Sequence, residues 1–178
     1  TRSDRDWSSD VCSSDLTAPL TLQQKYPPSP PCDCDVCRTF CRRPGWWTVG
    51  QARDAMDSGL GARMMLEVSP DRTFGVLSPA FSGCEGNFAL QELSHRGCTF
   101  LRQGLCELHS TSHMPLECRF CHHSLIGAGK ACHADLERDW RTARGQALVD
   151  EWLREYGVAA RFLAARAALS ATTRGMTR

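Results

Sequence analysis

The sequence predicts a small and irregular α+β fold that is mostly helical and carries one short β-hairpin. The hairpin is predicted by two β-rich runs, residues 64–68 and 73–77, which a Pro-Asp turn separates. The helices are predicted by apolar residues that recur every four positions, most clearly in 143–156. No internal repeat is visible in the sequence, so we expect one domain over residues 32–157.

Capping residues define where the predicted helices begin. Thr48 and Gln51 have the spacing of a capping box, which starts a helix over 49–58. Two more helices are expected over 132–140 and 143–156, the second capped by Thr142. Residues 158–178 are Ala-rich and are expected to form a C-terminal helix with a frayed tail.

The first 31 residues do not have the pattern of a folded domain. Residues 6–16 read DWSSDVCSSDL, which matches the translation of a short-read sequencing adapter, so we interpret residues 1–16 as non-native. Cys12 is accordingly excluded as a ligand. Residues 17–31 hold five prolines and are expected to form an extended linker.

Charge and hydropathy give no sign of a nucleic-acid or membrane partner. The chain has 21 Lys and Arg against 20 Asp and Glu, and leaving out residues 1–16 moves the formal charge from +1 to +3. This balance is too mild to indicate nucleic acid, and the sequence has no basic stripe with interleaved aromatics. No apolar run in the sequence approaches the ~20 residues of a membrane span. The apolar face of the C-terminal helices is either core packing or a surface for a protein partner.

Cysteine is the most informative residue type in this chain. Ten cysteines remain after Cys12 is set aside, and most of them lie in two tight runs with histidines nearby. Thiolates and imidazoles are the donors that zinc, iron and iron–sulfur clusters prefer. The runs therefore predict a fold organised around a cysteine-rich metal site, in a reducing, cytoplasmic compartment. Disulfides remain an alternative because disulfide-rich secreted domains are also dense in cysteine.

The two runs present their cysteines differently. Residues 32–41 read CDCDVCRTFC, which contains a C-x2-C knuckle. In residues 97–123 we expect two short strands around Gln103-Gly104 and a short helix from Pro115. The second run carries the following cysteines and histidines: Cys98, Cys106, Cys118, Cys121, His109, His113, His122 and His123.

Several of these features together resemble a known family. A cysteine run, a Pro-Gly-Trp turn, a helix and then Cys98-x7-Cys106-x11-Cys118-Arg119 are similar to the YkgJ-type cysteine-cluster family. That family is described as zinc- or iron-chelating and is similar to the cluster region of flagellin lysine N-methylases. The likeness covers residues 32–123. It departs from the family in the first run, where an adjacent Cys-Cys pair is common and this chain has none.

The knuckle and the resemblance together imply a set of metal ligands. Zinc and a 4Fe–4S cluster would use the same thiolates, so the spacing does not separate these cofactors. Arg119 is expected to donate hydrogen bonds to a thiolate or a carbonyl near the site. The predicted ligands are Cys34, Cys37, Cys41, Cys98, Cys106 and Cys118. The roles of Cys32, Cys84, Cys121, Cys132 and the histidines stay open.

The predicted function is metal binding with a structural or metal-handling role. The alternatives are an iron–sulfur-dependent enzyme, methyltransferase-like or redox, and a disulfide-held interaction module. The sequence has no glycine-rich nucleotide loop and no paired carboxylates in an apolar setting. It therefore names neither a substrate nor a catalytic residue.

Overall fold

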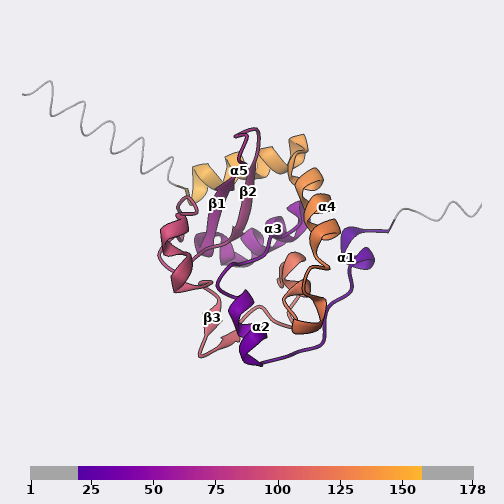
Figure 1. Ribbon diagram of the computed structural model, residues 1–178. Helices are drawn as coiled ribbons and strands as arrows, with labels where there is room; N and C mark the ends of the chain where they lie inside the picture. The colour runs from indigo at the N-terminus through magenta and orange to yellow at the C-terminus, as the bar shows by residue number, and fades with distance from the viewer. Residues whose placement is uncertain (1–19, 158–178) are drawn as a thin grey trace, which may run out of the picture.

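The computed structural model describes residues 20–157 and confirms the α+β class (Figure 1). Residues 1–16 and the C-terminal helix expected in 158–178 lie outside the described residues. In chain order the elements are α1 (Leu22–Lys25), α2 (Asp35–Phe40), α3 (Val49–Ala55), η1 (Met56–Leu60), η2 (Gly61–Arg63), β1 (Met64–Val68), β2 (Gly75–Pro79), η3 (Gln91–Arg96), β3 (Leu101–Arg102), β4 (Leu105–Cys106), η4 (Glu117–Phe120), η5 (His123–Leu125), α4 (Lys130–Trp140) and α5 (Ala143–Glu155).

The strands form two antiparallel pairs, as the sequence predicts. In the larger pair β1 and β2 run from Met64 opposite Pro79 to Val68 opposite Gly75. In the smaller pair β3 and β4 are joined by Gln103 and Gly104, whose φ angles are 50° and 81°. Two central residues with positive φ make the tight primed turn that matches the twist of a hairpin.

The capping box at the start of α3 is confirmed. The Thr48 side chain accepts the backbone N–H of Gln51, and the Gln51 side chain accepts the backbone N–H of Thr48. The end of this helix differs from the prediction of 49–58. The α-helix ends at Ala55, and the chain continues through the π-helical turn η1, where Gly59 has a φ of 82°. That left-handed position favours glycine and turns the chain toward β1.

Buried tryptophans form the centre of the main core. Trp47, Trp140 and Trp152 are fully buried among residues of α3, the β1–β2 hairpin and α5. The Trp140 indole N–H donates to the Trp47 carbonyl at 2.8 Å, and the Trp152 indole N–H donates to the Gly61 carbonyl at 2.8 Å. These rings therefore bury large apolar surface without leaving a polar group unpaired. We use the name apolar body for the part of the molecule that is formed by α3, the β1–β2 hairpin, α4 and α5.

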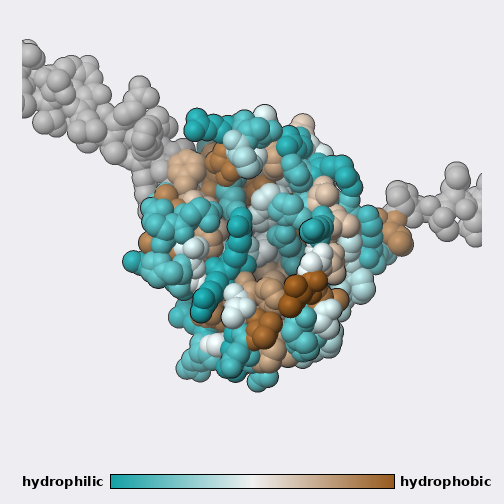
Figure 2. Space-filling model, in the orientation of Figure 1, coloured by the Kyte–Doolittle hydropathy of each residue, from teal (hydrophilic) through white to brown (hydrophobic). Residues whose placement is uncertain are grey.

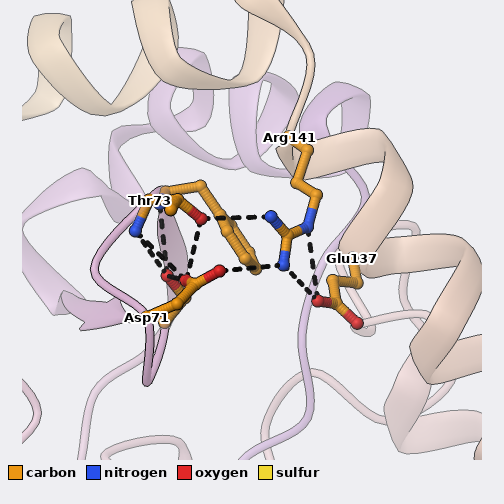
Figure 3. Close-up of polar contacts among 6 residues, drawn as sticks. Asp71, Thr73, Glu137 and Arg141 are labelled. Carbon is orange, nitrogen blue, oxygen red and sulfur yellow. Dashed lines mark hydrogen bonds and ion pairs between the residues drawn. The ribbon is translucent and has the colours of Figure 1, made fainter.

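A polar cluster fixes the hairpin turn to the end of α4 (Figure 3). The Arg141 guanidinium donates to Glu137 at 2.7 Å and to the Thr73 hydroxyl at 3.1 Å, and it lies 3.6 Å from Asp71. Its guanidinium carbon also sits 4.3 Å from the centroid of the Phe74 ring. The cluster holds the turn in place from the solvent side.

The apolar body also positions the second cysteine run. The buried Gln51 side chain donates to the Met114 carbonyl at 2.9 Å and accepts the Leu116 backbone N–H at 3.1 Å. The Trp47 indole N–H donates to the His113 carbonyl at 2.7 Å. Three hydrogen bonds from the start of α3 thus fix the chain just before Cys118.

The part of the predicted linker that the structure describes packs on α4. Tyr26 is buried, and its hydroxyl donates to Asp135 at 2.6 Å. Lys25 pairs with the same carboxylate at 2.6 Å. The chain then continues from this segment, which lies against α4, to α2, which lies below the apolar body in Figure 1.

No helix within residues 20–157 is long and apolar enough to cross a membrane. The face shown in Figure 2 is mostly hydrophilic, with apolar residues gathered over α2 and the neighbouring segment. Val36 of α2 and Ile126, which follows η5, are among the exposed large apolar residues.

Candidate metal centre

Sulfur and imidazole side chains meet where α2 and η5 begin. The Sγ atoms of Cys32, Cys34 and Cys37 lie 3.6, 3.6 and 3.5 Å from Nδ1 of His123. The backbone amide of His123 also donates to Cys37 Sγ at 3.3 Å. One imidazole nitrogen therefore faces three sulfurs from a segment 86 to 91 residues earlier in the chain. We call this set the Cys3His group.

His122 borders the same group. The ligand atoms of Cys32, Cys37, His122 and His123 all lie within 4.8 Å of one another, so these side chains can hold a metal ion. The His122 ring is buried, with its centroid 4.2 Å from that of His123. Its Nδ1 is already engaged by Ser124, through the hydroxyl at 2.7 Å and the backbone N–H at 3.2 Å. His123 is thus the imidazole whose Nδ1 faces the sulfurs.

The start of α2 explains why these sulfurs converge. Cys34 is the N-cap residue with an extended backbone, so Cys32 precedes the helix and Cys37 lies one turn inside it. The backbone amide of Cys37 faces the Cys34 sulfur and lowers the pKa of that thiol to about 7. Thiolate, the form that binds metals, is then abundant at neutral pH.

A second set of cysteines lines a cavity beside the Cys3His group. The cavity has a volume of about 520 Å³, and Cys32 and Cys37 form part of its wall. Its remaining cysteines come from the end of α2, from the β3–β4 hairpin and the segment just before it, and from the region of η4. They are Cys41, Cys98, Cys106, Cys118 and Cys121.

Backbone contacts hold these segments together. The Cys41 carbonyl accepts the backbone N–H of Cys98 at 2.8 Å. Gly45, in the Pro-Gly-Trp turn, donates its N–H to Cys118 Sγ at 3.3 Å. A Cβ added to Gly45 would lie 2.8 Å from the Cys118 nitrogen and 3.1 Å from its sulfur. Glycine is required here because any side chain would push η4 away from the turn.

Burial controls the protonation of Cys41 and Cys98. It raises the pKa of Cys41 to about 11 and the pKa of Cys98 to about 12. These thiols are therefore protonated at neutral pH when no cation is near them. A coordinating metal ion reverses this because its charge deprotonates the thiol that binds it.

The six predicted ligands fall into these two sets. Cys34 and Cys37 belong to the Cys3His group. The other four, which are Cys41, Cys98, Cys106 and Cys118, line the cavity next to it. Their binding of metal stays a prediction.

Sequence reasoning left Cys32 and His123 outside the ligand set. The signal for His123 was the His-His pair directly after Cys121, which the family pattern does not contain. Two further cysteines, whose roles the sequence does not decide, lie away from both sets. Cys84 packs in an apolar cluster with Met65, Ala80 and Phe81, and Cys132 packs with Tyr26, Leu116 and Leu136.

Arg119 and His133 have partners away from the sulfurs. Arg119 donates to the carbonyls of Gln23, at 2.9 Å, and of Tyr26, so it ties η4 to the α1 segment through carbonyls. The His133 Nδ1 bonds Glu117 at 2.8 Å.

Comparison with family models, with characterised proteins and with solved structures finds no match for this chain. The YkgJ-type resemblance is therefore an expectation from the sequence. The fold and the site define a small cysteine-rich α+β protein with a Cys/His group that can hold a metal ion.

Proposed function

We propose that this protein binds zinc at the Cys3His group and that the ion has a structural role. One observation carries the proposal: three cysteine sulfurs lie 3.5 to 3.6 Å from the same histidine nitrogen. Zinc binds cysteine sulfur at about 2.3 Å and histidine nitrogen at about 2.0–2.1 Å, in a tetrahedron. Two such ligands at the tetrahedral angle are about 3.6 Å apart, which is the separation found three times in this group.

The ligand number supports a structural role. Three cysteines and one histidine fill the four positions of a tetrahedral zinc ion, whereas catalytic zinc keeps one position open for water or substrate. The ion would join the start of α2 to η5 and so close a long loop of the chain. The amide that His123 donates to Cys37 is the kind of neighbouring contact that holds a metal-bound thiolate in place.

The state of the cysteines supports the same proposal. All ten cysteines in the described part of the chain are free thiols. A reducing, cytoplasmic compartment would keep them available for metal. The zinc- or iron-chelating character implied by the YkgJ-type resemblance agrees with this function.

Zinc analysis of the full chain under reducing conditions tests the proposal. We expect His123→Ala and Cys37→Ser each to lose one equivalent of zinc. The matched control is Cys84→Ser, which should keep it because Cys84 packs among Met65, Ala80 and Phe81. Cobalt in place of zinc should give the visible bands of a tetrahedral sulfur-rich site, and these bands should change in His123→Ala. Full zinc binding and an unchanged cobalt spectrum in His123→Ala would reject the proposal.

A further inference from the structure

Another cavity lies between β1, the Pro-Gly-Trp turn, the segment after β2 and α4, and no cysteine lines it. Its volume is about 610 Å³. Sites for small molecules usually measure roughly 300–1,000 Å³, with mainly apolar walls and a few polar groups. The apolar wall here includes Trp46, Phe74, Val76 and Phe88, and the polar groups include Arg43, Glu67 and His133. We call this space the Glu67 cavity.

Glu67 is the buried carboxylate of this cavity, and its side chain is only 12% exposed. Its Oε1 accepts the Ser78 hydroxyl at 2.8 Å and the Trp46 indole N–H at 3.0 Å. Within residues 20–157 no hydrogen bond to Oε2 is found, and its ion-pair partner Arg43 is 4.0 Å away on a side chain that is 74% exposed. Such an exposed pair contributes little. One oxygen of a buried carboxylate is therefore left for another donor.

His133 supplies a second acceptor in the wall. Its Nδ1 lies 2.8 Å from Glu117 Oε1, and this nitrogen carries the proton because a carboxylate can only accept. In the neutral ring Nε2 is then the acceptor. Among the described residues no hydrogen bond to this Nε2 is found. The wall thus carries two open acceptors, Glu67 Oε2 and His133 Nε2.

Trp46 fixes both acceptors in place. Its indole N–H bonds Glu67, and its backbone N–H donates to Glu117 Oε2 at 2.9 Å. Its ring lies against the His133 imidazole, with the centroids 4.5 Å apart. The carboxylate and the imidazole are therefore held before any ligand arrives, which lowers the entropic cost of binding one.

The charges of the wall favour a cation. Burial raises the pKa of Glu67, and a bound cation would favour its charged form. Glu137, another carboxylate of the wall, already pairs with Arg141 at 2.7 Å. An ammonium ion donates N–H groups to open acceptors and is attracted to aromatic faces such as that of Trp46. An anion would instead meet the unbalanced charge of Glu67.

We infer that the Glu67 cavity binds a small organic amine in its ammonium form. The nitrogen lies at Glu67 Oε2, with His133 Nε2 as the second acceptor, and the apolar part packs against Phe74 and Phe88. Arg43 moves aside, because its exposed side chain pairs with the same carboxylate oxygen. The inference does not rest on zinc binding, since the Glu67 cavity contains none of the Cys3His residues.

Calorimetric titration of the full chain under reducing conditions, with phenethylamine as the probe, tests the inference. The matched probes are phenethyl alcohol, which is neutral and of similar shape, and phenylacetate, which is an anion. We expect the amine to bind and the alcohol to bind at least about tenfold more weakly, because hydrogen bonds to charged groups are the stronger ones. Phenylacetate should not bind. The NMR signal of the Trp46 indole N–H should shift when the amine binds.

Two variants should change the affinity in opposite directions. Glu67→Gln keeps the shape of the side chain and should weaken amine binding by at least about tenfold. Arg43→Gln removes the competing cation and should strengthen it. The matched control is Glu151→Gln on α5, which should bind as the wild type does because Glu151 pairs with Arg53 and does not line the cavity. Unfolding midpoints of the three variants show that each is folded.

Four outcomes would overturn the inference. They are no binding of phenethylamine, equal affinity for the amine and the alcohol, tighter binding of phenylacetate, and unchanged affinity in folded Glu67→Gln. Zinc content measured on the same samples separates this cavity from the proposed zinc site. His123→Ala should lose zinc and keep its affinity for the amine, whereas Glu67→Gln should keep zinc.

Discussion

The apolar body is stabilised in a different way from a second part of the molecule, the thiol region. We define the thiol region as α2, the β3–β4 hairpin, η4 and η5. In the apolar body, helices of 11 and 13 residues pack against a hairpin whose strands have five residues each. In the thiol region, the strands have two residues each and η5 has three. Elements this short do not hold together on their own.

The difference teaches where the stability of each region comes from. The apolar body buries three tryptophans whose indole N–H groups are all hydrogen-bonded. The thiol region instead gathers sulfurs whose negative forms repel one another when no cation is bound. We therefore expect the apolar body to fold by burial of apolar surface and the thiol region to depend on bound metal.

Metal removal should produce the largest effect, and it should be confined to one region. Zinc binding to small cysteine-rich domains contributes on the order of 10 kcal/mol. Chelation under reducing conditions should strip hydrogen-exchange protection from the amides of Cys37 and His123. The amide of Ala52, inside α3, should keep most of its protection. Equal loss of hydrogen-exchange protection in both regions would show that the metal stabilises the whole domain. If neither region lost protection, the folding of this protein would not depend on metal.

The sequence predicts the apolar body better than the thiol region, for a physical reason. The capping box at Thr48 and Gln51, the hairpin and the long helix 143–156 are set by neighbours a few residues apart. Their spacing shows in the sequence, and the structure agrees with them to within a few residues.

The partners in the thiol region are set by contacts across the chain. His123 meets Cys32 across 91 residues, and no local pattern records which histidine will face which cysteine. The approach of Gly45 to Cys118 is equally long-range. The residue types of the site can therefore be predicted from the sequence. Which cysteines and histidines lie together depends on long-range contacts in the folded chain.

The contact between Gly45 and η4 joins the two regions, and Gly45→Ala should weaken it. The added Cβ would lie 2.8 Å from the Cys118 nitrogen, so η4 must shift. Strain of this kind costs about 1–3 kcal/mol. The shift would also displace Cys118, one of the predicted metal ligands, so metal content should fall. The measurements are denaturant unfolding and metal content.

Gly50→Ala is the matched control for that change. Gly50 lies inside α3, and its added Cβ would meet atoms no nearer than 3.8 Å. Alanine within a helix is better than glycine by up to roughly 0.5–1 kcal/mol, so this variant should gain stability and keep its metal. Equal unfolding midpoints for the two variants would mean that Gly45 does not hold the regions together.

The smallest effect expected is a pH dependence at two carboxyl groups of the apolar body. Burial raises the pKa of Glu67, which lies on β1, although its carboxylate accepts hydrogen bonds from Ser78 at 2.8 Å and from the Trp46 indole at 3.0 Å. Hydrogen bonds from Ser69 and Thr73 hold the pKa of Asp71 below its usual range. The two groups should therefore change stability in opposite directions (Figure 3 shows Asp71).

Below pH 4.5, the ordinary value for a glutamate, Glu67 is protonated in both the folded and the unfolded chain. As pH rises through the folded pKa, the unfolded chain ionises more readily, so the wild type loses stability relative to Glu67→Gln. For Asp71 the stabilisation is present above 3.8 and is lost as pH falls, so Asp71→Asn should be weaker than the wild type at neutral pH and approach it in acid.

Unfolding curves of the three proteins from pH 3 to 8, followed by tryptophan fluorescence, measure both effects. Metal release at low pH affects all three alike, so the differences between variant and wild type isolate the two carboxyl groups. We expect the Glu67→Gln difference to grow with pH and to stay within about 1 kcal/mol, the range of ordinary single substitutions. If both variants differed from the wild type in stability with the same sign, burial would not control the pKa of Glu67.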